Sequence, residues 1–453
     1  MIKPAKKNKS SIANRKPPNP KVRATAPTLD TSSLPGPDDT TRVELPNGIV
    51  VLARENFTSP AVVFDGSLQV GALDEPREKS GLARFTAACL MRGTERYAFA
   101  DIYEQIESIG ARLSFGGGTH TSGFGGKALA EDLDFLLGMA ADALRRPTFP
   151  PEHVEKVRGE MMTGYAIRAH DTGSMASMAF DDLLYPGHPY GLADDGYPET
   201  VATITREEIV NFHKAHYGPK GMIVVVVGAV KAEEAVALAQ KHFGDWMPSQ
   251  PSRLPLPPAP RIPEIKSTRI AIPGKSQSDI MLGCVGPQRS DPDFLDARMA
   301  NNIFGVFGMY GRLGDVVREK HGLAYYVYSQ VTGGIGPGPW QISAGVNPKN
   351  VDLAVELIVS EMKRVTTKKV TPVELADNKS LFVGRLPLQL ETNEGVAAML
   401  ESIELYNLGL DYLRRYPSLI NAITRESAQA AAARYLDPER YALAVAGPIT
   451  DNQ

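Results

Sequence analysis

Histidine, cysteine and acidic side chains are the first candidates for chemistry, because they bind metals and move protons. The chain has 8 histidines: His120, His153, His170, His188, His213, His216, His242 and His321. Only His213 and His216 lie close together, at i and i+3 of an expected helix, with Glu207 and Glu208 upstream. Two ligands do not make a zinc site, and the pattern turns that side of the helix toward solvent. We therefore expect no metal role for this pair.

Motifs for nucleophilic catalysis and phosphate binding are missing from the sequence. There is no G-x-S-x-G turn that would expose a serine nucleophile. The Gly-rich residues 114–126 have neither P-loop spacing nor a G-x-G-x-x-G that opens a helix. Cys89 and Cys284 lie in apolar runs without C-x-x-C spacing, which favours two buried free thiols.

The segment NNIFGVFGMYGRLGDVVREKHGLAYYVYSQ, residues 301–330, has a more suggestive pattern. A helix is expected around LGDVVREK, followed by a strand over LAYYVYSQ. Gly322 between them is a typical helix stop. Glycines loosen the chain before the helix, at Gly305, Gly308, Gly311 and Gly314.

One cationic and one phenolic side chain in this segment could act together. Alternation along the strand puts Tyr325 and Val327 on one face, and Tyr326 and Tyr328 on the other. Arg318, at the end of the helix, and Tyr325 could both donate hydrogen bonds to a carbonyl oxygen. Spacing alone favours a plainer reading, in which the arginine is solvated and the tyrosine packs in a sheet.

A second segment of interest is SGLARFTAACLMRGTERY, residues 80–97. Leu82, Phe85, Cys89 and Leu90 recur at helical spacing, which predicts a helix with one apolar face. Ser80 is a plausible N-cap for this helix. None of these residues does chemistry by itself.

The elements that position these segments occur twice. ITREEIVNFHKAHYGPKGMIVVVVG, residues 204–228, corresponds to ITRESAQAAAARYLDPERYALAVAG, residues 423–447. Thr205 and Thr424 are predicted N-caps, each opening an amphipathic helix that leads through a proline-containing turn to a buried strand. A repeat of about 220 residues is too long for a solenoid and indicates two similar domains.

The rest of the chain fits this duplication. Residues 129–161 and 347–379 each predict a helix, a short loop and a second helix. We place an N-terminal domain at 41–246, a Pro-rich linker at 247–263 and a C-terminal domain at 264–453. Because each domain starts with strands, the predicted fold is α+β, with a mainly antiparallel sheet packed with helices in each homologous domain.

Residues 1–40 have a composition of their own. Residues 1–23 carry Lys and Arg but no Asp or Glu, and they have too few apolar residues to form a core. They lack the apolar segment of a secretory signal, and Pro17, Pro18 and Pro20 would break a transit-peptide helix. We interpret 1–40 as a flexible basic arm; docking of this arm on a partner subunit is the alternative.

The overall composition excludes several classes of protein. A net charge of −3 gives no signal for nucleic acid. No apolar run is long enough to cross a membrane, so a soluble protein is expected. The compartment is not determined, although a bacterial cytoplasm or periplasm is favoured over the mitochondrial matrix.

Several stretches form a recognisable set. LPNGIVVL, residues 45–52, precedes GALDEP and SGLARF…LMRGT. LLYPGHPYG then leads into the first copy of the repeat, and GRLGDVVREKHGLAYYVYS follows in the second domain. Together they resemble the pitrilysin/insulinase-type metallopeptidases, the inverted-zincin family, over residues 41–448. The similarity is greatest to half-length members of the processing-peptidase type, which work as two-subunit assemblies with a metallohydrolase-like duplicated fold.

The chain departs from this family at the catalytic motif. Family members carry H-x-x-E-H on the helix of residues 82–90, where two His bind zinc and the Glu activates water. Here the corresponding positions hold Arg84, Ala87 and Ala88. These side chains offer neither a ligand nor a general base, and the guanidinium would repel a dication.

The position of the family's third zinc ligand is also changed. The resemblance places this ligand near Tyr165 or Ala166, and neither side chain binds zinc. Glu160 lies about a turn and a half earlier and would face elsewhere. The resemblance therefore implies no metal on this chain.

The second-domain signature is intact. In the family, an Arg and a Tyr seven residues later bind the scissile carbonyl and stabilise the oxyanion, and here these are Arg318 and Tyr325. Gly305, Gly308 and Gly311 fall where the non-catalytic subunit of the processing peptidase carries a glycine-rich loop. They are therefore a possible substrate-gating loop.

The resemblance implies a non-catalytic subunit of a heterodimeric zinc metallopeptidase, with no cofactor of its own. A homologous partner with an intact H-x-x-E-H would supply zinc, and the substrate would be an unfolded peptide that adds to a sheet edge. Alone, the chain is not expected to be an enzyme. One alternative is a structural core subunit or peptide-binding scaffold. Another is a rebuilt catalytic site, for which the histidines offer no cluster.

Overall fold

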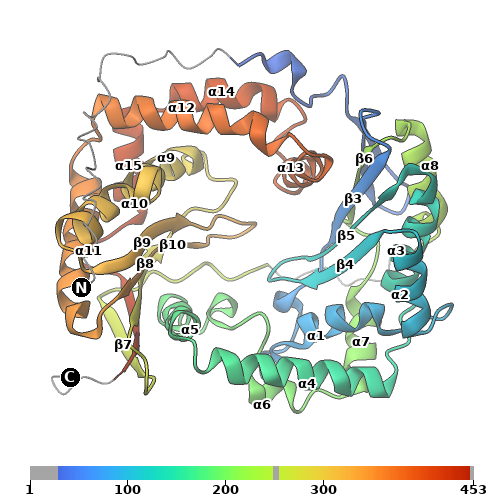
Figure 1. Ribbon diagram of the computed structural model, residues 1–453, viewed down its shortest axis with the longest axis horizontal. Coiled ribbons are helices and arrows are strands. Elements are labelled where there is room, and N and C mark those ends of the chain that lie inside the picture. Colours follow the sequence, from blue (N-terminus) through green and yellow to red (C-terminus); the bar gives the residue numbers. More distant parts are fainter. Residues whose placement is uncertain (1–28, 248–254, 449–453) are drawn as a thin grey trace, which may run out of the picture.

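A computed structural model describes residues 29–247 and 255–448 of the chain. Most of the predicted arm, part of the linker and the last five residues lie outside the described residues. Two sheets face each other across the molecule, each with helices on its outer side (Figure 1). The predicted α+β fold with two similar sheets is confirmed, whereas the domain limits 41–246 and 264–453 stay predictions.

The first half of the chain builds a six-stranded sheet in the order β1-β2-β6-β3-β5-β4. Its strands are β1 (Thr41–Glu44), β2 (Val50–Glu55), β3 (Ala61–Leu68), β4 (Arg112–Gly117), β5 (Ser122–Leu129) and β6 (Ile223–Gly228). All pairs are antiparallel except β2 with β6. A hairpin turn at Asn47-Gly48 joins β1 to β2, and Gly48 has the positive φ, 86°, that such a turn needs.

The second half repeats this topology without the equivalent of β1. Its five-stranded sheet has the order β7-β11-β8-β10-β9. The strands are β7 (Lys266–Ala271), β8 (Ser278–Val285), β9 (Ala324–Val331), β10 (Pro339–Val346) and β11 (Ala442–Gly447). Here β7 and β11 form the parallel pair, in the place of β2 and β6. Strands β4 and β9 are therefore corresponding edges of the two sheets.

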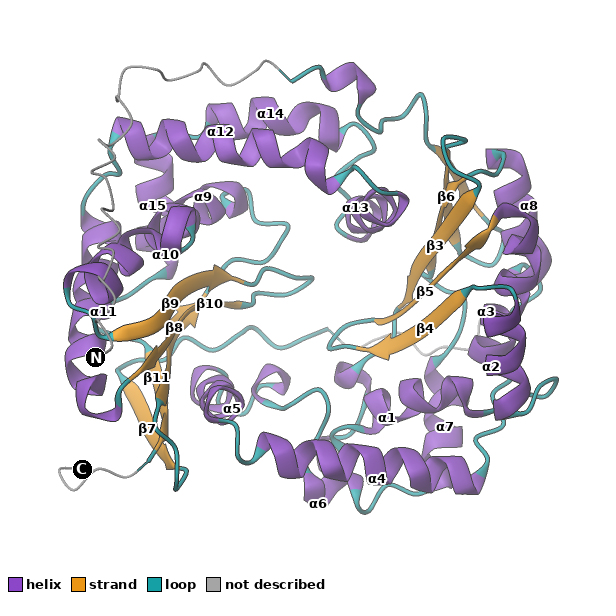
Figure 2. Cartoon of the chain, viewed as in Figure 1, coloured by secondary structure: helices purple, strands orange, loops and turns teal. Residues whose placement is uncertain are grey.

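Helices make up most of the remaining structure (Figure 2). In the first half they are α1 (Leu82–Cys89), α2 (Phe99–Ser108), α3 (Leu133–Arg145), α4 (Pro151–Arg168), α5 (Thr172–Leu184), α6 (Pro198–Val201), α7 (Arg206–His216) and α8 (Ala232–Phe243). In the second half they are α9 (Phe294–Gly305), α10 (Phe307–Leu313), a π-helix (Gly314–Lys320), α11 (Val351–Thr367), α12 (Pro372–Gln389), α13 (Asn393–Leu405), α14 (Tyr412–Ala422) and α15 (Arg425–Tyr435).

The internal repeat predicted from the sequence is confirmed in detail. Thr205 and Thr424 cap α7 and α15 through side-chain oxygens that accept from Glu208 N and Ser427 N. Each helix leads to a central strand, β6 or β11. The N-caps satisfy backbone N–H groups that would otherwise lack partners, which explains why the helices begin at these threonines.

Each sheet is covered on one face by a helix from the other half. Helix α5, from the first half, packs on β7, β8 and β11, where Phe180 and Leu184 are completely buried. Helix α13, from the second half, packs on β3 and β6, where Val396 and Leu400 join the buried Val225. Figure 1 shows both helices on the inner side of the sheets that they cover. The exchange joins the two halves through two apolar interfaces.

The described end of the predicted arm also connects the halves. Leu34 is 5 % exposed and belongs to the apolar core of the second half. Asp38 pairs with Arg414 on α14, while Asp39 pairs with Arg54 on β2 at 2.7 Å. Residues 29–40 are therefore packed against both halves.

None of the helices in the described part of the chain has the length and apolar character required to span a bilayer.

A half-buried carboxylate lies beneath one of the exchanged helices. Asp65 on β3 faces α13, which carries Glu394 and Glu401. Burial, together with these two acids, raises the pKa of Asp65 to about 6. Lys127 on the neighbouring strand pairs with Glu394 at 2.6 Å, and Asp65 forms no ion pair with a described residue.

Replacing Asp65 with asparagine should stabilise the protein near neutral pH. Because the pKa of Asp65 is raised in the folded state, its ionisation lowers the free energy of unfolding as pH rises from about 4 through about 6. At about pH 7.5 the Asp65→Asn variant should gain roughly 1 kcal/mol, a value reduced for partial solvent screening. Urea unfolding at about pH 7.5 and about pH 4.5 measures this. Asp182→Asn, at an exposed site, is the control; an equal gain at both pH values would contradict the explanation.

Candidate functional site

The helix that carries the altered motif is capped by a residue the sequence analysis did not select. Glu75 accepts from Gly81 N at 2.7 Å and from Ala83 N at 2.6 Å. Ser80, the expected N-cap, instead donates its hydroxyl to Ala193 O. The prediction was wrong because a carboxylate from the preceding loop reaches both N–H groups at the start of α1, which no local pattern reveals. Burial raises the pKa of Glu75 to about 7, although these two bonds oppose the shift.

Helix α1 presents the motif positions without ligands. Arg84 and Ala88 are exposed one turn apart, as two zinc-binding His would be, while Ala87 is 3 % exposed. Gly117, at the end of β4, lies so close that an added Cβ would be 3.0 Å from the Arg84 Cα. The helix and its approach to the sheet edge are therefore kept, whereas the metal-binding side chains are absent.

Of the two positions near which the family resemblance expects the third ligand, Tyr165 is buried and Ala166 is exposed. Tyr165 on α4 is 5 % exposed and donates its hydroxyl to the Asp195 carbonyl. Arg168 stacks over the Tyr165 ring at 4.7 Å and donates to the Asp195 carboxylate at 2.6 Å. Glu160 faces away, as predicted, and pairs with Arg92 at 2.8 Å. Tyr165 is thus held in place by a hydrogen bond to a backbone carbonyl and by the stacked Arg168.

A pocket of about 540 Å³ lies between the halves beside this site. Arg168, Asp181 and Asp194 line it from the first half, and Thr332 and Gln341 from the second. Burial raises the pKa of Asp181 to about 7, with a contribution from Asp194. Burial also raises the pKa of Asp194, against an opposing hydrogen bond from Thr119 and the nearby charge of Arg84.

The histidine pair on α7 is not arranged as expected. His213 is 8 % exposed, and its Nε2 lies 2.9 Å from the Leu144 carbonyl. The prediction that this side of the helix faces solvent was wrong, because α7 packs against α1 and the His213 imidazole lies in the packed interior. Burial lowers the pKa of His213 to about 4. Within residues 29–247 and 255–448, no three His, Cys, Asp or Glu side chains form a group that could hold a metal.

Both cysteines are buried free thiols, as the sequence predicted. Burial raises the pKa of Cys89 to about 12 and that of Cys284 to about 11. Neither is poised as a nucleophile, because the thiolate is the reactive form.

Arg318 lies near the end of the π-helix Gly314–Lys320, where Gly322 stops the helix as predicted. Its guanidinium carbon is 5.6 Å from the ring centre of Tyr310. The helix is anchored at its start by Arg312, which donates two bonds of 2.7 Å to the Glu374 carboxylate. Burial would raise the pKa of Glu374, but the bonds from Arg312 and Thr371 outweigh it and hold the value at about 2.

Tyr325 occupies an irregular position in β9. On the partner strand, Val346 pairs with Ala324 and Gly345 with Tyr326, so Tyr325 is the extra residue of a β-bulge. It is 67 % exposed, whereas Val327 is completely buried. The prediction that these two residues share a face was therefore wrong, and the bulge is the reason. No hydrogen bond joins Arg318 to Tyr325 in the described structure, although the two elements that carry them pack together.

The glycine-rich segment before the π-helix has two kinds of glycine. An added Cβ at Gly305 would meet Ser329, and one at Gly311 would meet the Ile303 carbonyl, so both allow close packing. Gly308 has open space around it and a φ of 66°. Met309, beside it, is 59 % exposed. The segment is thus fixed at both ends and exposed in the middle.

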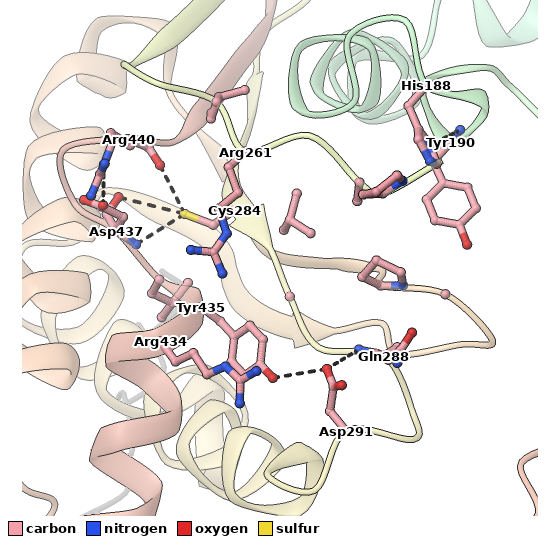
Figure 3. A pocket seen from close by; sticks show the side chains of 18 of the residues that line it. His188, Tyr190, Arg261, Cys284, Gln288, Asp291, Arg434, Tyr435, Asp437 and Arg440 are labelled. Atoms are coloured by element: carbon pink, nitrogen blue, oxygen red, sulfur yellow. Dashed lines mark hydrogen bonds and ion pairs between the residues drawn. The ribbon is translucent and has the colours of Figure 1, made fainter. Parts of the chain in front are cut away.

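A second pocket, of about 660 Å³, lies apart from Arg318 and Tyr325 and from the motif positions on α1 (Figure 3). The linker, the end of β8 and the end of α15 line it, and Figure 3 shows Arg261 directed into it near Cys284 and Tyr435. His188 is held there by bonds to Pro257 O and Tyr190 N. None of the motif positions contributes to this pocket.

Comparison with known proteins assigns the fold and the family. Residues 50–178 match the family described as Insulinase (Peptidase family M16), and residues 203–382 match the one described as Peptidase M16 inactive domain. The chain belongs to peptidase family M16. The first match lies within the first half, and the second runs from α7 at the end of the first half into the second half. Together they fit a half-length M16 protein with a duplicated fold.

Individual relatives agree with this assignment. The chain is 27 % identical to an "uncharacterized zinc protease" of Mycobacterium leprae over 91 % of this chain and 92 % of that protein. It is 26 % identical to the mitochondrial-processing peptidase subunit beta of Mus musculus, over 89 % and 84 % respectively. A structure from Pseudomonas fluorescens, titled a peptidase M16 inactive domain, has a TM-score of 0.85 at 25 % identity, covering 91 % of this chain and 98 % of that one.

The altered motif predicts that this M16 chain has no tight zinc site. The combined variant Arg84→His, Ala88→His and Tyr165→Glu should gain zinc binding, because it restores three ligands on α1 and α4. Metal analysis after dialysis against a weak chelator measures this, with circular dichroism to check folding. Arg84→His alone should bind no zinc after the same dialysis. A stoichiometric zinc ion in the unsubstituted chain would contradict the prediction.

Proposed function

We propose that this chain is the non-catalytic subunit of a heterodimeric zinc metallopeptidase. The observation that carries the proposal is a contrast between its two halves. Arg84, Ala87 and Ala88 stand at the positions of the zinc motif, whereas Arg318 and Tyr325 keep the family's substrate-binding pair on two packed elements. A chain without ligands but with that pair is suited to complete another subunit's site.

The partner in this proposal is a homologous chain with an intact H-x-x-E-H. Its zinc would supply an activated water and polarise the scissile carbonyl. The Arg318 guanidinium and the Tyr325 hydroxyl donate hydrogen bonds to the carbonyl oxygen, where negative charge develops as water attacks. The exposure of Tyr325 supports this role, because a donor to a substrate must be accessible.

The substrate in this proposal is an unfolded peptide. Strands β4 and β9 are sheet edges with unpaired backbone groups, so an extended peptide can add to either one. Backbone bonds of this kind give affinity with loose sequence preference. The loop with Gly305, Gly308 and Gly311 touches Arg318 through Tyr310 and would control access to it.

Tyr325→Phe should lower kcat of the two-subunit enzyme by about a hundredfold, because one oxyanion donor is lost. Zinc content and subunit association should not change. Peptide cleavage by the reconstituted pair measures this, and Tyr328→Phe on the same strand is the matched control. Turnover unaffected by Tyr325→Phe would remove the assignment.

Arg318→Gln should reduce kcat/KM of the pair by a similar factor, since a charged donor is replaced by a neutral one. Lys320→Gln, at an exposed site at the end of the same helix, controls for the loss of charge. Peptidase activity of the isolated chain, measured in parallel, would contradict the non-catalytic role.

The second candidate is a structural core subunit or a peptide-binding scaffold with no peptidase role. The packed fold and the hydrogen-bonded Tyr165 are compatible with this candidate, since neither depends on catalysis. This candidate does not require Arg318 or Tyr325. Binding of a zinc-containing partner without any effect of these two substitutions on its turnover would favour it.

A further inference from the structure

The bulge at Tyr325 leaves the direction of this side chain weakly determined by its own strand. Regular pairing between β9 and β10 is interrupted there, and the ring is 67 % exposed. A bulge re-aims a side chain, but it also loosens the local hydrogen-bond ladder. Besides its packing against α9 and the π-helix, the start of β9 has a further polar contact.

That contact is a buried carboxylate beneath the next residue. Asp279 on β8 is 5 % exposed, and its Oδ1 accepts from the Tyr326 hydroxyl at 2.5 Å and from Gln277 Nε2 at 2.8 Å. Its Oδ2 accepts from the Thr172 hydroxyl. Asp279 forms no ion pair with a described residue. The hydrogen bonds from these three donors are therefore what stabilises its buried carboxylate.

Gln277 directly precedes β8, but the two hydroxyl donors come from other parts of the fold. Thr172 is the first residue of α5, the helix from the first half that covers the second sheet. Tyr326 follows Tyr325 directly on β9. Asp279 therefore connects the exchanged helix, the centre of the sheet and the edge strand that carries the bulge.

The Tyr326 ring is also held by packing. Gly345, opposite it on β10, leaves the space that the ring occupies, because an added Cβ would lie 2.5 Å from a ring carbon. The Tyr326 ring is 5.9 Å from that of Tyr328. Burial and the bond to Asp279 raise the pKa of Tyr326, so it stays protonated as the donor.

We propose that Asp279 is a positioning residue for Tyr325. It anchors Tyr326 to β8 and to α5, and this anchor determines the direction in which the bulge presents the Tyr325 hydroxyl. A charge-assisted bond suits this task because it is stronger and more directional than a neutral one. The catalytic consequence rests on the proposed function, whereas the anchor itself does not.

Hydrogen exchange in the isolated chain tests the anchor. Asp279→Asn removes the charge and should speed amide exchange over residues 325–328 by about tenfold, because this end of β9 opens more often. Asp65→Asn is the matched control: it changes a half-buried carboxylate under the other exchanged helix and should leave β9 unaffected. Tyr326→Phe keeps the ring and should reproduce the effect if Asp279→Asn does not fold. Unchanged exchange over residues 325–328 in the folded variant would overturn the proposal.

Turnover by the reconstituted pair tests the consequence. Asp279→Asn should lower kcat by about tenfold while KM changes by less than about twofold, since a misplaced donor weakens the transition state more than substrate binding. In a Tyr325→Phe background the same substitution should have no further effect, because the group that it positions is already gone. Equal losses in both backgrounds would overturn the positioning role. If Tyr325→Phe alone leaves kcat unchanged, the proposed function fails, and the exchange experiment still decides the anchor.

Discussion

The reciprocal cover of the two sheets is the constraint on which this structure depends. A sheet with an apolar face must bury it, and here α5 and α13 each do so for the opposite half. Separating the halves would expose both faces to water at the same time, at a cost that grows with the apolar area. The two halves are thus held together as one unit, and residues far apart in sequence, such as Thr172 and Asp279, become hydrogen-bond partners.

The helix that carries the altered motif, α1, is fully capped and packed. Glu75 still satisfies the N–H groups at the start of α1, and Ala87 still packs close to the end of β4. Tyr165 fills its position and bonds to a backbone carbonyl. The helix needs its cap and its apolar contacts in order to fold, but it does not need metal ligands. The architecture around α1 is therefore intact without metal ligands on this helix.

In the second half, polar side chains anchor the elements that carry Arg318 and Tyr325. The Arg312–Glu374 pair holds the start of the π-helix, and Asp279 holds the start of β9. Buried charges are costly unless they are fully bonded, so their presence here is better explained by geometry than by stability. Both anchors lie next to the elements that carry Arg318 and Tyr325. This arrangement is what a subunit would need if its contribution were two correctly placed donors.

Much of the fold could be predicted from the sequence, because it rests on local signals. Periodicity, the threonine caps at 205 and 424 and the Asn47-Gly48 turn act over a few residues, and the duplication is visible as a repeat. The candidate residues on α1 and in 318–325 could be named because their spacing resembles a family. By contrast, the cap at Glu75, the burial of His213 and the bulge at Tyr325 depend on partners that are distant in sequence.

The sequence by itself therefore determined the repeated sets of elements and their order. It also shows Arg84, Ala87 and Ala88 at the positions where the family resemblance expects metal-binding side chains. Only the tertiary structure decided that α5 and α13 each cover the sheet of the opposite half. It also decided that Tyr325 forms a β-bulge and that Asp279 binds the hydroxyl of Tyr326, the next residue. The physical reason is that caps and periodicity are properties of neighbouring residues. The cover of a sheet and the bonding of a buried charge are settled only when distant segments meet.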